Sequence, residues 1–462
     1  MYQLFFYPST VNMSLPPSAL TGVTVPTQRY SNALTEEFPS QNRNYLVEAG
    51  ISSRLRRDFL PANSSISNGG ISDSYIEFNL TSNQQEFFDL QSFAIETKIK
   101  LVKGANLDIA KEDNVSVIDG LGHRLFSKCT VFFNGTPVSG NTYFGLHNSV
   151  RTYLTMGEHS LRSTGRLMYY KSIDTDIEDE ITMKNFDIGK ITKDERTVID
   201  ECKTVLHTLT PLDLDIASAN FYLLNGVDIR IRLDLAPREL IINAPDGASK
   251  QYSYELQLAK LWCEKVVPYP SALLSLNKNL ISGNGTIEYL FDKPIVKNYI
   301  FPAGHSTLTL ENIFNGYVPR VVYVYLLKQS ALTGVYNKNG AYLTHANISN
   351  IRLDINGNTF SSTTSSFPDS IAQLFHHTLS NIKDANHLLT YHSFKKGRTV
   401  FCWNLSPTDC KDVLHIEKSG NIRINIQTES PPTENLAVFV TGITTGIIDV
   451  DHSRRVKTTF LM

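Results

Sequence analysis

Apolar and polar residues alternate with a period of two along much of the chain after about residue 75. The alternation runs through Tyr75–Leu80 and Phe93–Val102, and it returns in Gly226–Leu235 and Tyr254–Trp262. This period is typical of β-strands that bury one face. A continuous apolar run at Val321–Leu327 predicts a further strand. We therefore expect the body of the protein to be built from β-strands.

Two Asn-Gly pairs mark sharp turns between strand-like runs. Asn134 and Gly135 follow the apolar run Lys128–Phe133, and Asn356 and Gly357 follow Ile351–Ile355. Both central residues of a two-residue hairpin turn need a positive φ, which Asn and Gly tolerate better than other residues. We identify these four residues as candidate structural turns and predict a hairpin around each pair.

Two stretches change to a helical period. Apolar residues recur at helical intervals within 143–156 and again within 369–382, which predicts one helix after each hairpin. The run Gly420–Ile426 then resembles Gly226–Leu235. The same order of strand, hairpin, helix and strand thus occurs twice, which indicates two similar β-sandwiches. Jelly rolls are a common arrangement of about eight such strands.

The fold class predicted from this pattern is all-β, with two tandem jelly rolls, a few short helices and an extended N-terminal arm. Residues 1–70 are rich in Ser, Pro, Asn and Thr without sustained periodicity, which is typical of an arm or loop. Pro268 and Pro270 interrupt the alternation and favour a domain junction there. We expect an arm at 1–70, a first jelly roll at 71–270 and a second at 271–462.

Composition narrows the classes of function. The net charge of −2, from 43 basic and 45 acidic residues, provides no basic face for sequence-specific binding of nucleic acid. Five scattered cysteines do not form a disulfide framework and fit a reducing site of synthesis. We predict no membrane span, because no apolar run reaches the roughly 20 residues that a spanning helix needs.

Few residues are arranged as a catalytic or phosphate-binding site would require. Gly120-Leu-Gly122 and Gly283-Asn-Gly285 lack the remaining glycines and the Lys-Ser/Thr of a phosphate-binding loop. Cys402 and Cys410 have neither the spacing nor a second pair that zinc needs. We interpret the glycines as turns and the cysteines as buried apolar residues, and we predict no catalytic residue and no cofactor.

Three groups of ionisable residues invite a functional interpretation. Asp174, Asp176, Asp179 and Glu180 are spaced like a hard-cation site, but they lack the Gly and terminal Glu of a calcium loop; we favour a solvated loop. The neighbours His376 and His377 point about 100° apart on a helix, so both cannot comfortably bind one metal ion. We interpret Asp449 and Asp451 as solvated charges at the end of a strand. We therefore predict no metal site.

Several segments, taken in order, resemble the capsid-type proteins of Maverick/Polinton elements and the related adintoviruses. The resemblance runs from Tyr75 to Val456 and rests on the order and spacing of six short segments. These are Phe87–Leu90, Leu125–Gly135, Val318–Val322, Gly334–Asn339, Ser419–Arg423 and Ile448–Arg454. Residues 1–70 match nothing in this family.

The resemblance implies a double jelly-roll major capsid protein and not an enzyme. Such a protein forms homotrimers that act as pseudo-hexameric capsomers of an icosahedral shell around a double-stranded DNA genome. Its implied partners are neighbouring capsomers and a single jelly-roll penton or vertex protein. It is made in the host cytoplasm, with the nucleus as an alternative place of assembly, and it ends in the virion capsid.

Three alternatives stay open at the level of the sequence. A vertex or minor capsid protein is also built from β-sandwich strands but usually has one jelly roll. A non-viral carbohydrate-binding or hydrolytic β-sandwich protein predicts a compact monomer with an aromatic-lined cleft. An element-derived gene kept by a host for another use would have the same fold.

Overall fold

The structure is a computed structural model of a single chain, and it describes residues 51–460 apart from internal gaps. Most of the predicted N-terminal arm therefore lies outside the described residues. The gaps are 64–65, 68–69, 72–73, 105–106, 110–112, 114, 172–175, 182–204, 220, 246–250, 283–284, 363–368, 383–386 and 407–417.

The first jelly roll is formed by two antiparallel sheets that face each other. In one sheet the order is β10-β5-β14, with β1 on the far side of β14, and in the other it is β4-β12-β8-β9. The principal strands are β1 (Ile51–Phe59), β4 (Tyr75–Leu80), β5 (Phe87–Lys103), β8 (Phe126–Phe133), β9 (Thr136–Asn141), β10 (Val205–Pro211), β12 (Ile229–Leu235) and β14 (Tyr252–Pro268).

The second jelly roll repeats this topology strand for strand. Its sheets have the orders β15-β24-β18-β21 and β16-β23-β19-β20. In each half the first principal strand pairs with the eighth, the eighth with the third and the third with the sixth, which is a jelly roll. The strands are β15 (Thr286–Phe301), β16 (Thr307–Leu310), β18 (Val321–Lys328), β19 (Ile348–Ile355), β20 (Asn358–Ser362), β21 (Phe401–Asn404), β23 (Ile422–Thr428) and β24 (Leu436–Asp451).

This repeated topology confirms the predicted fold class of two tandem jelly rolls. One principal strand lies where the sequence pattern predicted only an arm: β1 pairs with β14 from Ile51 opposite Pro268 to Phe59 opposite Leu261. Its position in the first sheet is the one that β15 holds in the second. The arm, as far as the structure describes it, thus contributes a strand to the first jelly roll.

Short strands and helices connect the principal strands. The short strands are β2 (Ile66–Ser67), β3 (Gly70–Ile71), β6 (Leu107–Asp108), β7 (Ser116–Val117), β11 (Tyr222–Leu223), β13 (Ile242–Asn243), β17 (Tyr317–Val318), β22 (Lys418–Ser419) and β25 (Val456–Phe460). The helical segments are α2 (Leu121–Arg124), α3 (Phe144–Thr155), α4 (Glu158–Ser160), η2 (Leu161–Gly165), η3 (Asp215–Ala219), η4 (Arg238–Leu240), α8 (Pro270–Ser282), α9 (Gln329–Leu332), α10 (Asp369–Asn381) and α11 (Tyr391–Lys395).

Helices α3 and α10 confirm the two helices that the spacing predicted after the hairpins. Helix α8 was not predicted, because Pro268 and Pro270 suggested a break. Pro270 is instead the first residue of the helix, where its fixed φ suits the first turn and its missing N–H removes no hydrogen bond. The two prolines therefore end β14 and begin α8 between the two jelly rolls.

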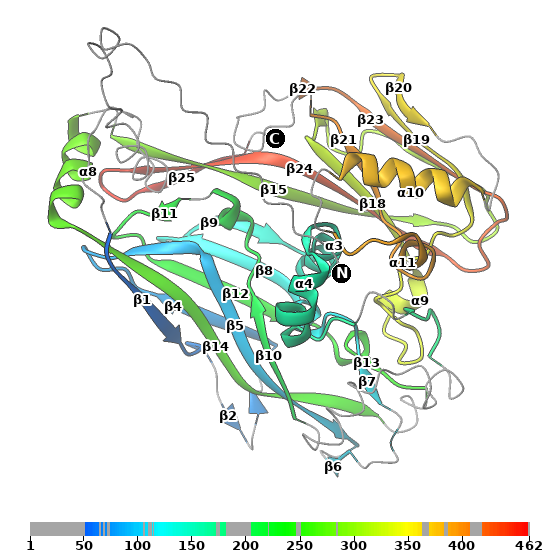
Figure 1. Ribbon diagram of the computed structural model, residues 1–462, viewed down its shortest axis with the longest axis horizontal. Helices are drawn as coiled ribbons and strands as arrows, with labels where there is room; N and C mark the ends of the chain where they lie inside the picture. The colour runs from blue at the N-terminus through cyan, green and yellow to red at the C-terminus, as the bar shows by residue number, and fades with distance from the viewer. Residues whose placement is uncertain are drawn as a thin grey trace, which may run out of the picture.

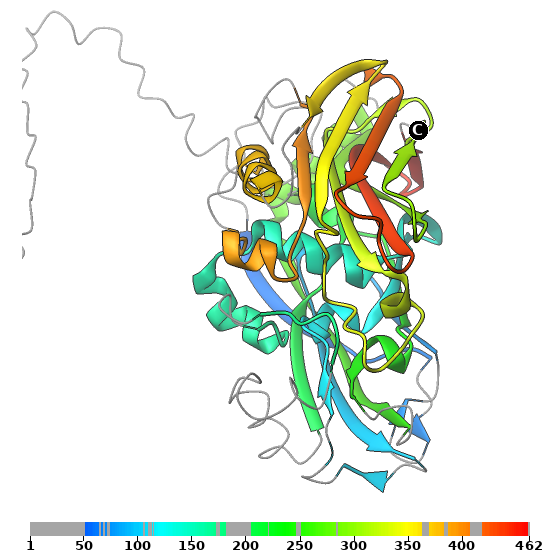
Figure 2. The same cartoon turned by 90° about the vertical axis from the view of Figure 1, so that its right-hand side faces the viewer.

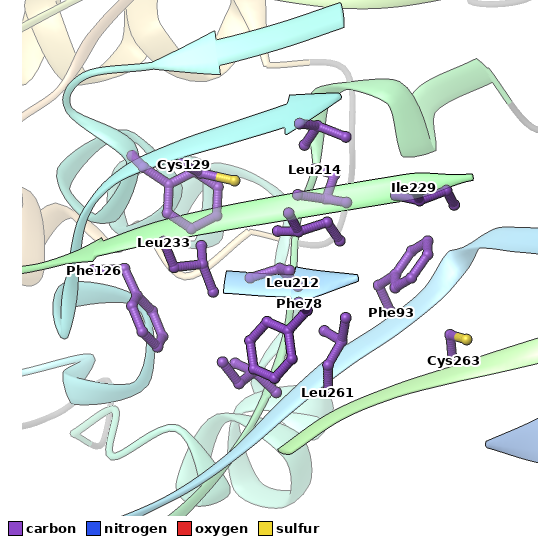
Figure 3. Close-up of a cluster of buried hydrophobic side chains, with 14 of the residues drawn as sticks. Phe78, Phe93, Phe126, Cys129, Leu212, Leu214, Ile229, Leu233, Leu261 and Cys263 are labelled. Atoms are coloured by element: carbon purple, nitrogen blue, oxygen red, sulfur yellow. The ribbon is translucent and has the colours of Figure 1, made fainter. Parts of the chain in front are cut away.

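Each jelly roll encloses a core of apolar side chains from both of its sheets. In β5 the residues Phe93, Ile95 and Ile99 are fully buried, whereas Lys98 between them is exposed, as the period of two requires. Figure 3 shows part of this core, where Phe78 lies beside Leu261 and Phe126 lies near Leu233. Each such side chain contributes roughly 1.5–3 kcal/mol by leaving water.

The long strands β15 and β24 extend out of the second jelly roll and lie along the first (Figure 1). Their inner halves enclose the second core, and their outer halves supply Tyr289, Phe291, Ile448 and Val450 to the first core. The two jelly rolls are therefore not independent domains joined by a linker. They share two strands, each of which covers part of both cores.

Candidate functional site

The four predicted turn residues lie at the tips of two equivalent hairpins. Asn134 and Gly135 join β8 to β9 with φ values of 47° and 81°, and Asn356 and Gly357 join β19 to β20 with φ values of 52° and 82°. All four are in the left-handed region, where Asn and Gly are favoured over other residues.

Each turn asparagine also holds the strand next to its hairpin. The backbone N–H of Asn134 donates to the carbonyl oxygen of Asp228 at 3.0 Å, and the N–H of Asp228 donates to Asn134 Oδ1 at 2.8 Å. Asn356 and Asn421 make the same two bonds, at 2.9 and 2.8 Å. The two bonds need a short side chain with an acceptor oxygen and a residue that tolerates φ > 0, and Asn meets both conditions.

The equivalence continues at a third strand end. Asp228 Oδ1 accepts from the N–H of Ser82, which follows β4, and Asn421 Oδ1 accepts from the N–H of Asn312, which follows β16. The duplication is thus visible in individual hydrogen bonds. These residues fix the ends of three strands in each jelly roll, which is a structural role.

The tip of the first jelly roll has an additional partner from the second. Asn134 Nδ2 donates to the carbonyl oxygen of Arg454, in the turn between β24 and β25, at 2.8 Å. The Arg454 guanidinium in turn donates to the Asn225 carbonyl oxygen at 2.6 Å and to Asn225 Oδ1 at 2.8 Å. Partial burial lowers the pKa of Arg454. The C-terminal hairpin therefore fastens the second jelly roll to the first.

Helix α3 forms the main apolar contact between the two jelly rolls. Phe144 at its start belongs to the first core, whereas Leu146, Val150 and Tyr153 pack against the outward face of the β18–β24 sheet. That face presents Tyr325 and Phe439, whose rings stack at 5.4 Å between centroids. Ten of the twelve residues of α3 are buried, so the helix is buried on both sides.

Gly145 allows α3 to approach the preceding segment closely. A Cβ at this position would stand 2.6 Å from the carbonyl oxygens of His123 and Phe126, and backbone atoms cannot move aside cheaply. We expect Gly145→Ala to lower the free energy of unfolding by about 1–3 kcal/mol through overpacking. Gly140→Ala is the matched control, because no atom lies within 4 Å of its added Cβ. Equal thermal midpoints for both variants in a melting experiment would contradict the assignment.

A buried polar group also joins the two halves. Asp119 of the first jelly roll accepts from the Tyr153 hydroxyl at 2.9 Å and from the N–H of Lys171 at 2.6 Å. Arg398 of the second places its Nη2 3.8 Å from Asp119 Oδ2, and both side chains are almost fully buried. Its guanidinium also lies 5.4 Å from the centre of the Tyr153 ring. The pair is enclosed between the two jelly rolls.

The acidic segment that we interpreted as a solvated loop is bound to the second jelly roll where it is described. Asp176 pairs with His392 at 2.6 Å, Asp179 with Lys328, and Glu180 with Lys338 at 3.3 Å. Asp174 lies outside the described residues. Each partly exposed ion pair contributes only about 0–1 kcal/mol.

Backbone hydrogen bonds fix the same segment in place. The N–H of Ile181 donates to the carbonyl oxygen of Asn337 at 2.7 Å, and the N–H of Asn339 donates to that of Asp179 at 3.0 Å. Residues 176–181 therefore form a strap from the first jelly roll across the second. We call this strap, α3, the Asp119–Arg398 pair and the β24–β25 turn together the junction.

The histidines and cysteines singled out in the sequence are not brought together. His376 is exposed, while His377 is half-buried with its Nε2 2.7 Å from Ser361 Oγ, and burial lowers the pKa of His377. Cys129, Cys263 and Cys402 are buried free thiols, and burial raises the pKa of each. Cys410 lies outside the described residues.

The remaining candidates serve as turns and strand ends. Gly120 takes a φ of 73° before the four-residue helix α2, which is too short to form a phosphate cradle. Gly285 also has a positive φ, and Gly283 lies outside the described residues. Asp451 Oδ1 accepts from the N–H of Arg455 at 2.8 Å and so closes the β24–β25 turn.

The described part of the chain contains neither a cluster of metal ligands nor a helix that could span a membrane. Within it, no three His, Cys, Asp or Glu side chains lie close enough to hold a metal ion. Among the helices in the same residues, none has the length and apolar character to cross a membrane. Several of the polar residues that the fold brings together lie at the junction.

Comparison with solved structures gives the same fold for several viral proteins. No protein-family model and no curated protein matches the chain. It is similar to the mavirus major capsid protein, with 13% identity, a TM-score of 0.53, and coverage of 99% of this chain and 97% of that one. A Sputnik virophage chain is 11% identical with a TM-score of 0.58, and the match covers 91% of each chain. The Faustovirus major capsid protein is 10% identical with a TM-score of 0.55, and the match covers 88% of this chain and 92% of that one. At such low identity the likeness shows the double jelly-roll fold.

Proposed function

We propose that this chain is the major capsid protein of a Maverick/Polinton-like or adintovirus-like DNA element. It acts as a structural subunit and not as an enzyme. Three copies form a pseudo-hexameric capsomer, and capsomers together with a single jelly-roll vertex protein enclose a double-stranded DNA genome. The jelly rolls divide near residue 270, and the N-terminal arm contacts neighbouring subunits.

The junction is the observation that carries this proposal. Two sandwiches of the same topology are fastened by a helix buried on both sides, a strap and a C-terminal hairpin. A shell subunit must hold its two jelly rolls at a fixed angle, because each capsomer reuses the same surfaces around a closed symmetry axis. The likeness to capsid proteins over most of the chain supports the same assignment.

The described polar residues serve this structural role. The turn asparagines bind neighbouring strand ends, the strap carboxylates bind basic residues of the second jelly roll, and the buried cysteines are held as neutral thiols by their raised pKa. A hydrolytic or carbohydrate-binding sandwich instead needs convergent polar groups in an open cleft. A vertex protein needs only one jelly roll.

The mass of the purified protein tests the proposal. We expect light scattering to give a species near three times 51.8 kDa, and negative-stain images of the same sample to show hexagonal outlines or closed shells. A strict monomer at high concentration would overturn the capsid assignment and favour the binding or hydrolytic sandwich. Five-fold particles in the same images would favour a vertex protein, because the vertices of an icosahedral shell have five-fold symmetry.

A further inference from the structure

The two helices that follow the hairpins occupy equivalent places but differ in burial. Helix α3 is covered on one side by its own core and on the other by the second jelly roll. Helix α10 packs on its own core through Ile371 and Leu374, and the Ser370 and Thr378 hydroxyls donate to backbone carbonyl oxygens there. The exposed residues of α10 lie at helical intervals, at Asp369, Ala372, Gln373, His376 and Ser380. Figure 2 shows α10 and α11 on one side of the molecule, beside the strands of the second jelly roll.

The sheet faces show the complementary difference. The outward face of the β18–β24 sheet is covered by α3 and is apolar, with Tyr325, Leu327 and Phe439 buried. The equivalent face of the β5–β14 sheet carries Lys98, Lys260 and Trp262, of which Lys98 is exposed and the other two are partly exposed. The same chain therefore has one helix-on-sheet contact formed and both halves of a second, equivalent contact open.

We propose that the exposed stripe of α10, with the adjoining surface of α11, packs against the outward face of the β10–β5–β14 sheet in a second copy of this chain. This contact repeats between copies the one that α3 makes within a copy. The inference rests on the proposed trimer and names its interface. Helix and sheet are different patches, so the contact is heterologous, and closed symmetry then produces a ring.

The chemistry of the open sheet face fits a contact that forms after folding. The Trp262 indole N–H donates to Glu96 Oε2 at 3.0 Å, His207 Nε2 lies 2.9 Å from Glu96 Oε1, and the Arg56 guanidinium lies 5.0 Å from the Trp262 ring centre. Such a face is stable in water before assembly, whereas the apolar face under α3 is covered as the chain folds. Aromatic and arginine side chains are also enriched in interfaces between proteins.

A charged substitution on α10 tests this interface. Ala372 is exposed in the middle of the stripe, and Ala372→Arg is expected to leave the fold intact and to convert the trimer into a 51.8 kDa monomer by light scattering. Ser271→Arg, at an exposed position in the first turn of α8, is the matched control and should remain trimeric. Unchanged circular dichroism spectra of both variants show that folding is preserved, whereas the melting temperature of a monomer is expected to fall because it loses the stabilisation of the trimer.

Cross-linking of the natural sequence provides a second readout that needs no variant. Trimers reassembled from equal amounts of ¹⁴N- and ¹⁵N-labelled chains are treated with an amine-reactive cross-linker. We expect mixed-isotope links from the exposed Lys395 of α11 to Lys98 or Lys260.

The outcomes separate this interface from the capsid assignment. A folded Ala372→Arg variant that stays trimeric overturns the interface while the trimer itself stands. If that variant fails to fold, the links decide, and the absence of mixed-isotope links between these lysines, with every link confined to peptides of one isotope, also overturns the interface. A natural sequence that is monomeric overturns the proposed function and the interface together.

Discussion

Replacing Asp119 by alanine should lower the free energy of unfolding by about 3–5 kcal/mol, the cost of breaking a buried ion pair by removing one partner. The substitution leaves the Arg398 guanidinium enclosed without its carboxylate, and it removes the acceptor of the Tyr153 hydroxyl and of the Lys171 N–H. Because the two partners come from different jelly rolls, we expect the loss to weaken the attachment of one to the other. Chemical unfolding followed by circular dichroism measures the change.

An exposed aspartate provides the control for this experiment. Asp58 pairs with Lys260 at 3.7 Å, and about half of its side chain is exposed, so Asp58→Ala should cost only about 0–1 kcal/mol. A double substitution of Asp119 by Asn and Arg398 by Met should recover part of the loss, because it leaves no unpaired buried charge. If Asp119→Ala is no worse than Asp58→Ala, the buried pair does not hold the junction.

The repeated architecture could be predicted from the sequence because its signals are local. The Asn-Gly pairs determine two hairpins through their φ values, and the apolar spacing within 143–156 and 369–382 determines two helices. The strand that follows the helix in each half, Gly226–Leu235 or Gly420–Ile426, is also recognisable. A residue near its start must hydrogen-bond to the hairpin asparagine. Local chemistry and topology agree at these positions.

Strand β1 escaped prediction because its pattern is not that of a half-buried strand. Arg54, Arg56 and Arg57 are all exposed, and only Ile51, Leu55 and Phe59 are partly buried, which leaves no clear period of two. Its place is set instead by pairing with β14 over its whole length. Such an edge strand with several charges also resists pairing with other chains.

The junction was beyond sequence reasoning for a different reason. Asp119 and Arg398, or Asn134 and Arg454, meet only when both jelly rolls have formed, and nothing in their local sequence marks the partner. The acidic residues at 176–180 show the same difficulty. Their spacing resembles a hard-cation site and the missing calcium-loop residues favoured a solvated loop, but their partners are basic residues of the second half. Long-range charge pairing has no signature in a single sequence.

The asymmetry of the duplicated halves carries functional information that neither half shows alone. The tip of the first jelly roll has an additional hydrogen bond to Arg454, although Asn134 and Gly135 are as exposed as Asn356 and Gly357 at the equivalent tip of the second. The difference in burial lies in the helices, because α3 is buried on both sides and α10 on one. Wherever the first copy of an element is covered within the chain and the second is not, the open copy is where another chain can bind in the equivalent way.

Acidification is expected to destabilise the protein through His147, a residue of α3 that is 5% exposed. Burial and the neighbouring Arg151 charge lower its pKa from 6.5 to about 3. His147 therefore binds a proton below about pH 6.5 in the unfolded chain, but only below about pH 3 in the folded chain. The resulting stabilisation is complete above pH 6.5 and is lost as the pH falls toward 3, by up to about 4–5 kcal/mol in all.

His147→Gln should remove this slope, because glutamine keeps a polar side chain that does not titrate. The free energy of unfolding of the natural protein and of the variant is measured by urea unfolding between pH 7.5 and 4, and the difference between them should shift in favour of the variant as the pH falls. Burial also lowers the pKa of His123, whereas it raises the pKa of Asp215 to about 6, and these contributions cancel in the difference because both proteins carry them. The exposed His159 supplies the control substitution, His159→Gln. A constant difference across this range for His147→Gln would mean that α3 accepts the imidazolium without loosening the junction.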